Sequence, residues 1–201
     1  HSTTAAAYRA WFQLCRDGLG PDALIHERAL GSNCLDVTAG IVDLQRVWGD
    51  ADRWYPGMAA KCGLRWYKNR VVMSYYPDSK AFVGFGEKGR IDYAPMEMTE
   101  RRSVLTMLYM TSGRIESATS VIKLDGATVY DIGRAFPMYS APRSPRPVDA
   151  FTGIKSPRVY AFRVDDQWQQ VALCNDEKQA NTVAAPLSGD QVSTGSLGLD
   201  P

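Results

Sequence analysis

The first half of the chain alternates short apolar segments with stretches in which apolar residues recur at helical spacing. Helical spacing is found over residues 3–18, 53–67 and 100–111, and strand-like segments over 22–27, 40–48 and 70–76. Strands that alternate with helices form parallel sheets, because each helix carries the chain back to the starting edge. The sequence therefore predicts an α/β fold built on a parallel sheet.

Beyond residue 114 this alternation gives way to a different pattern. Four prolines fall within 137–147, as in a connecting segment. Segments 158–164 and 168–174 have the composition of two strands joined as a hairpin, and a third strand is expected near 181–187. We expect three parts, namely an α/β part over 1–114, a connecting segment over 115–142 and an antiparallel β domain over 143–201.

The charge and cysteine content exclude several classes of function. Lys plus Arg number 23 and Asp plus Glu number 22, so the net charge of +1 argues against a nucleic acid or an anionic membrane as partner. No apolar run approaches the roughly 20 residues of a membrane helix, and no signal peptide is visible at the first residues. The four cysteines have no zinc or redox spacing. We therefore expect no metal or cofactor, and the compartment and oligomeric state stay open.

Residues 46–54 lie where the second predicted strand meets the helix that follows it. In α/β barrels the active site lies at this carboxyl end of the strands. Period-two alternation places Arg46, Trp48 and Asp50 on one side, which suits Asp50 to general acid chemistry. An apolar wall such as Trp48 favours the protonated form of a nearby carboxyl group. Alternatively, Asp50 or Asp52 caps the helix and Arg46 pairs with it.

Aromatic residues are concentrated between residues 48 and 76. They pack a core, or else they line a concave site that stacks on flat apolar surfaces such as the C–H face of a sugar ring. In the second case Trp48 is a substrate-binding residue.

Several short motifs occur in an order that matches a known enzyme family. Arg46 and Asp50 form an Arg-x-x-x-Asp motif, and Tyr75-Tyr76-Pro77-Asp78 ends the next predicted strand. The same order includes residues 8–27, 98–113, 134–137 and 168–175. Together they resemble the second half of the clan D glycoside hydrolases, the α-galactosidases and relatives of families 27 and 36. In those families Asn-Asp-Pro-Asp stands where this chain has Tyr75 to Asp78.

The resemblance implies a role for each matched residue. Asp50 matches the catalytic acid/base, and Arg46 matches the arginine that hydrogen-bonds the sugar near its anomeric centre. Glu27 resembles a sugar-binding glutamate, although it is equally read as a surface carboxylate paired with the next residue. Asp78 matches the last aspartate of Asn-Asp-Pro-Asp, or is an ordinary Pro-Asp turn residue. The two tyrosines before Pro77 depart from the family, so the sugar specificity stays open.

The resemblance also implies a fold and a reaction. The fold is the C-terminal part of a (β/α)8 barrel followed by an antiparallel β-sandwich. The reaction is the retaining hydrolysis of α-galactosides or related glycosides, in which two carboxyl groups lie ~5–5.5 Å apart. No segment matches the strand that carries the nucleophile, so the expectation is a fragment that lacks it. The alternatives are a non-catalytic carbohydrate-binding or interaction module and an unrelated small α/β domain.

Overall fold

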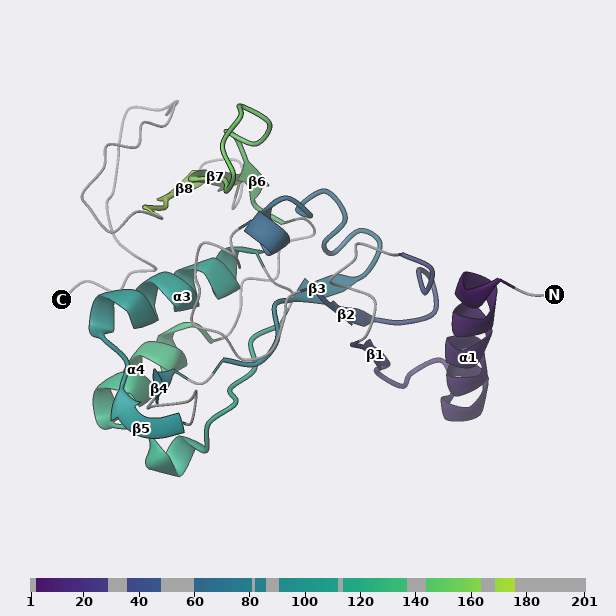
Figure 1. The fold of residues 1–201 in the computed structure, drawn as a ribbon, viewed down its shortest axis with the longest axis horizontal. Coiled ribbons are helices and arrows are strands. Elements are labelled where there is room, and N and C mark those ends of the chain that lie inside the picture. Colours follow the sequence, from purple (N-terminus) through teal and green to yellow (C-terminus); the bar gives the residue numbers. More distant parts are fainter. Residues whose placement is uncertain are drawn as a thin grey trace.

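The computed structural model contains helices and three small sheets joined by turns and loops (Figure 1). The described residues are 3–28, 36–47, 60–80, 82–85, 91–111, 114–136, 144–163 and 169–175. None of the helices in these ranges is both long and apolar enough to cross a bilayer.

A three-stranded parallel sheet lies at the centre of the first half of the chain. It contains β1 (His26–Glu27), β2 (Leu44–Arg46) and β3 (Ser74–Tyr76), paired in the order β1-β2-β3. Both pairs are parallel, as the sequence predicts for these strands. Each strand is shorter than its apolar segment, because the preceding residues form turns and loops rather than ladder hydrogen bonds. Closure into a barrel stays a prediction.

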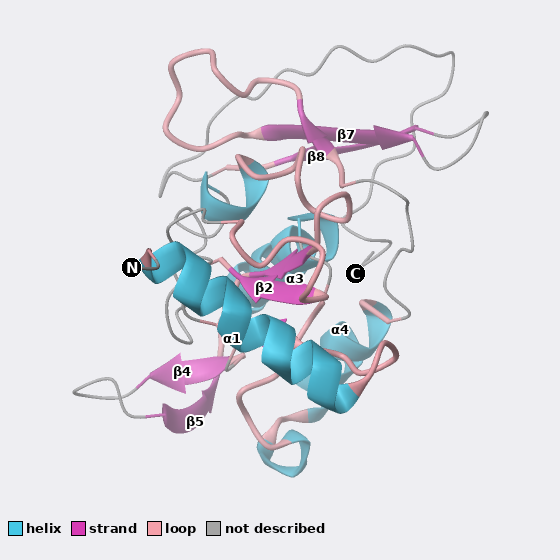
Figure 2. Cartoon of the chain, turned by 90° about the vertical axis from the view of Figure 1, so that its right-hand side faces the viewer, coloured by secondary structure: helices cyan, strands magenta, loops and turns pink. Residues whose placement is uncertain are grey.

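Helix α1 (Thr4–Leu19) precedes the sheet and lies beside it, in front of β2 in Figure 2. Its first turn is capped by Thr3, whose hydroxyl accepts a hydrogen bond from the Ala6 amide at 3.2 Å. None of its side chains is fully buried. Instead, the Arg16 guanidinium holds the helix in place: it bonds the Ile41 carbonyl and pairs with Asp43 at 2.7 Å.

The segment after β3 contains a hairpin, although Gly84, Gly86 and Gly89 in the sequence predict a loop there. Strands β4 (Val83–Phe85) and β5 (Ile91–Pro95) pair antiparallel, with Val83 opposite Pro95 and Phe85 opposite Ile91. The prediction of a loop was wrong because the β-branched and aromatic residues on both sides of the glycines favour strands.

Two helices follow the hairpin, and a buried ion pair joins them. Helix α3 (Met98–Thr111) was expected, whereas α4 (Gly126–Arg134) lies in the predicted connecting segment. Asp125 caps α4 by accepting from the Thr128 amide at 2.9 Å. Arg101 of α3 donates to the Asp131 carboxylate of α4 from Nε at 2.8 Å and from Nη2 at 2.6 Å. This pair fixes the two helices against each other (Figure 1).

The C-terminal part forms a separate antiparallel sheet. Strands β7 (Val159–Arg163) and β8 (Gln169–Leu173) pair as the predicted hairpin. A third strand, β6 (Arg146–Pro147), pairs with the other side of β7. The strand expected at 181–187 lies outside the described residues. A short 3-10 turn, η3 (Val121–Lys123), lies between the two halves of the chain.

This sheet packs on the first half of the chain through a close contact at Gly63. Residues 60–63 are helical, and the rest of the helix expected over 53–67 is turn or lies outside the described residues. A Cβ added to Gly63 would lie 2.1 Å from the hydroxyl of Tyr160 in β7. One hydrophobic cluster includes the side chains of Tyr75, Leu105 and Tyr160, so the parallel sheet, α3 and the C-terminal sheet share a core.

Candidate functional site

The pairing register divides the parallel sheet into two faces. Residues opposite each other across a ladder point to the same side, and successive residues alternate. One side, the Arg46 face, carries His26, Leu44, Arg46, Ser74 and Tyr76. The other side, the Glu27 face, carries Glu27, Gln45 and Tyr75. Adjacent residues of one strand therefore have different surroundings.

The Glu27 face is the structural side of the sheet. Glu27 is fully buried, and its Oε1 accepts a hydrogen bond from the Tyr8 hydroxyl of α1 at 2.8 Å. Burial and this neighbouring carboxylate raise the pKa of the Tyr8 phenol well above its usual value. The Tyr75 hydroxyl donates to Asp36 at 3.0 Å, and Tyr75 itself belongs to the hydrophobic core. This face therefore anchors helices and loops.

The Arg46 face carries a buried carboxylate between two arginines. Asp78, two residues after β3, is only 4% exposed. Its Oδ2 lies 3.3 Å from Arg46 Nη1, and its Oδ1 lies 3.5 Å from Arg28 Nη2. Arg46 ends β2 and Arg28 follows β1, so the carboxyl ends of all three strands contribute to this group. Arg28 is 61% exposed, which places the group within reach of solvent.

The backbone at Asp78 is held in an uncommon conformation. Its φ is +82°, in the left-handed region that non-glycine residues avoid and that aspartate tolerates better than most. Residues held in such regions carry a cost of about 1–3 kcal/mol and cluster at functional sites. The conformation aims a buried carboxylate at two arginines, which an ordinary exposed turn aspartate would not need.

Two aromatic side chains lie next to this charged group on the same face. His26 and Tyr76 meet edge to face, with ring centroids 4.6 Å apart. Burial raises the pKa of the Tyr76 phenol to about 12, with the carboxylate of Glu116 adding to the effect. Burial also lowers the pKa of the His26 imidazole below its usual 6.5. Both side chains are therefore neutral near pH 7.

The structure brings together some of the residues predicted from the sequence. Arg46 and Asp78, both predicted site residues, form an ion pair. Glu27 lies on the opposite face and bonds to Tyr8. Trp48 and Asp50 lie outside the described residues. No group of three or more metal-ligating side chains is found in the part of the chain that the structure describes.

Sequence reasoning overlooked three residues of the Arg46 face. Arg28 was considered only as a partner of Glu27, whereas it pairs with Asp78. His26 was not assigned to the site, and Tyr76 was considered only as one of the aromatic residues between 48 and 76 that pack a core or line a concave site. The sequence did contain a signal for Tyr76, because Tyr75-Tyr76-Pro77-Asp78 departs from the family motif. A side chain as large as that of Tyr76, directly before Pro77, must occupy space on this face.

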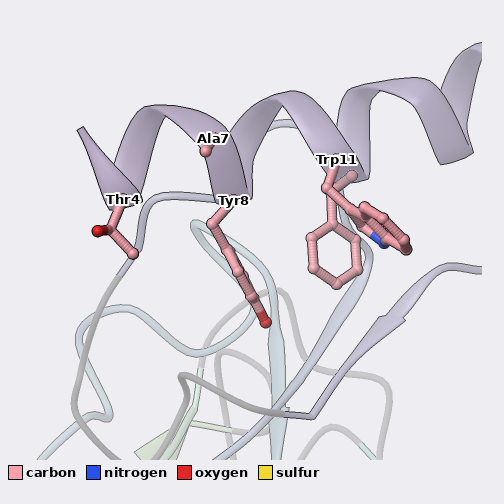
Figure 3. Close-up of a pocket in the computed structure, with 5 residues that line it drawn as sticks. Thr4, Ala7, Tyr8 and Trp11 are labelled. Carbon is pink, nitrogen blue, oxygen red and sulfur yellow. The ribbon is translucent and has the colours of Figure 1, made fainter. Parts of the chain in front are cut away.

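A hollow lies on the surface of α1. It has a volume of about 400 Å³, and it is lined by Thr4, Ala7, Tyr8, Trp11 and Phe12. Figure 3 shows Tyr8 and Trp11 extending from the same side of the helix. None of these five lining side chains carries a charge near pH 7.

The fold and the Arg46 face define a class of site: charged side chains gathered where parallel strands end, the usual position of ligand and active sites in α/β proteins. Comparisons with protein-family models, with curated proteins and with solved structures found no match for this chain.

Proposed function

We propose that this chain is the C-terminal part of the catalytic domain of a retaining glycoside hydrolase that acts on α-galactosides or related glycosides. The observation that carries the proposal is the ion pair between Arg46 and the buried Asp78 at the ends of adjacent parallel strands. The two residues come from separate motifs of the family resemblance, and independent motifs that meet at one site are expected if both serve that site.

The charged pair suits a sugar ring. An arginine offers only donors and an ionised carboxylate offers only acceptors, so together they can bond the hydroxyl groups of a sugar, which do both. Arg46 would bond the sugar near the anomeric carbon. Asp78 would accept from a ring hydroxyl, while Arg28 keeps its second oxygen in place at 3.5 Å.

In the proposed reaction Asp50 is the general acid and base. It protonates the departing glycosidic oxygen in the first step and activates water in the second. The carboxylate that attacks the anomeric carbon would come from a barrel strand preceding β1. Trp48, two residues before Asp50, would supply an apolar wall beside the acid.

Substitution of the proposed acid tests this function. In the complete natural protein that carries this sequence, Asp50→Asn should reduce the hydrolysis of alkyl α-galactosides by orders of magnitude, because their leaving groups require a proton. Unchanged turnover would reject the proposal. If the wild-type protein binds galactose but hydrolyses no glycoside, the carbohydrate-binding module is the better account.

A further inference from the structure

We infer that Tyr76 and His26 form a subsite that hydrogen-bonds one hydroxyl group of a neutral sugar ring beneath the Arg46–Asp78 pair. The inference rests on the proposed function, because it names how the same site recognises its sugar. It adds two residues that the family motif does not supply, since Tyr76 stands where those families have an aspartate.

Tyr76 and His26 each hold a buried polar atom that has no hydrogen-bond partner in the part of the chain that the structure describes. Tyr76 is fully buried, yet its hydroxyl makes no hydrogen bond to any of the described residues. The Nε2 atom of His26 is likewise buried and unbonded. Leaving a buried polar group unsatisfied costs about 1–3 kcal/mol, so native proteins rarely keep two together unless something else binds them.

Tyr76 and His26 lie next to the Arg46–Asp78 ion pair. Tyr76 is directly opposite Arg46 in the β2–β3 ladder. The centroids of the Tyr76 and His26 rings are 4.6 Å apart. Asp78 follows Tyr76 by two residues and is joined to Arg46. The two unbonded atoms therefore belong to side chains on the same face of the sheet as the charged pair.

The hydrogen-bonding properties of the two unbonded atoms indicate the chemical class of the ligand. The phenol is a neutral donor, and a neutral imidazole nitrogen is either a donor or an acceptor. A hydroxyl group can accept from Tyr76 and still donate to or accept from His26. The charges around the Tyr76 phenol oppose one another, with the carboxylates of Glu116 and Asp78 set against the guanidinium groups of Arg28 and Arg46, so they favour neither an anion nor a cation. A neutral hydroxyl group of the ligand can therefore bond both the Tyr76 phenol and the His26 imidazole.

Adjacent tyrosines provide a matched pair of variants. Tyr76→Phe removes the unbonded hydroxyl on the Arg46 face, and Tyr75→Phe removes the hydroxyl that donates to Asp36 on the Glu27 face. We expect Tyr76→Phe to weaken galactose binding about tenfold without lowering the melting temperature, because one hydrogen bond to the ligand is lost and none within the protein. Tyr75→Phe should lower the melting temperature and leave galactose affinity unchanged.

The experiment is calorimetric titration of the complete natural protein with galactose and with its monodeoxy analogues, alongside thermal melting. In the wild type, one deoxy analogue should bind about tenfold more weakly. In Tyr76→Phe the same analogue should bind as well as galactose, because both partners of one hydrogen bond are then absent. His26→Phe should reduce galactose binding in the same direction as Tyr76→Phe.

Three outcomes would overturn the inference. The first is that the wild type and Tyr76→Phe bind galactose with equal affinity. The second is that Tyr76→Phe and Tyr75→Phe lose equal amounts of galactose affinity. The third is that the deoxy analogue still binds more weakly than galactose in Tyr76→Phe. These outcomes are separate from the test of the proposed function. Asp50→Asn with unchanged hydrolysis would reject the acid/base assignment, and the coupling between Tyr76 and one sugar hydroxyl would still stand as sugar binding.

Discussion

Removal of the Asp131 carboxylate should destabilise the protein strongly, because it would leave the Arg101 guanidinium buried without its counter-charge. Arg101 and Asp131 are 3% and 1% exposed, and two of their hydrogen bonds are shorter than 2.9 Å. Breaking a buried ion pair on one side costs about 3–5 kcal/mol. At roughly 2–4 °C per kcal/mol for a chain of this size, Asp131→Ala should lower the melting temperature by roughly 6–20 °C.

The assay is thermal and urea unfolding followed by circular dichroism, with two controls. Arg102→Ala removes the more exposed arginine, which contacts Asp131 at 3.3 Å, and should change the stability by about 1 kcal/mol or less. The double variant Arg101→Met and Asp131→Leu replaces both charges with apolar side chains and should recover most of the loss. A loss below about 1 kcal/mol in Asp131→Ala would refute the reasoning.

Two further predictions concern the contact between the sheets and the titration of the Arg46 face. Gly63→Ala should destabilise the protein by about 1–3 kcal/mol, since its Cβ would overlap the Tyr160 hydroxyl, and Tyr160→Phe in the same chain should recover part of that loss; equal unfolding midpoints in urea for Gly63→Ala and the wild type would exclude the overlap. The lowered pKa of His26 means that the unfolded chain takes up its proton at higher pH than the folded chain. The contribution of His26 to stability is therefore complete above pH 6.5 and falls as the pH decreases through the folded pKa. His26→Gln should flatten the decline in urea midpoint between pH 7 and pH 5, and an unchanged decline would show that other groups cause it.

The sequence predicted the elements whose signals are local. Helix α1 has a capping threonine and helical spacing, and the β7–β8 hairpin has two strand-like segments with a turn between them. Helix α4 was missed because it contains Gly126 and Gly133, which have low helix propensity. Its stability comes instead from the Asp125 cap and from the distant partner Arg101, neither of which periodicity detects.

The candidate site was predictable in part for the same reason. Arg46 ends one strand and Asp78 follows the next, and the ends of parallel strands converge, so their proximity could be expected. The face of the sheet on which Glu27 lies could not be predicted. It depends on the pairing register, which places Glu27 opposite Gln45 rather than opposite Arg46. Pairing register is a property of two strands together, and the sequence of one strand does not contain it.

The central claim is that Asp50 donates the proton to the leaving group at the site organised by Arg46 and Asp78. The most direct test compares Asp50→Asn with Asp52→Asn in the complete natural protein, using α-galactosides whose leaving groups span a wide range of acidity. The account predicts that Asp50→Asn loses orders of magnitude with alkyl leaving groups and little in the first step with dinitrophenol, while Asp52→Asn behaves like the wild type. Equal losses for every leaving group, or no loss at all, would contradict it.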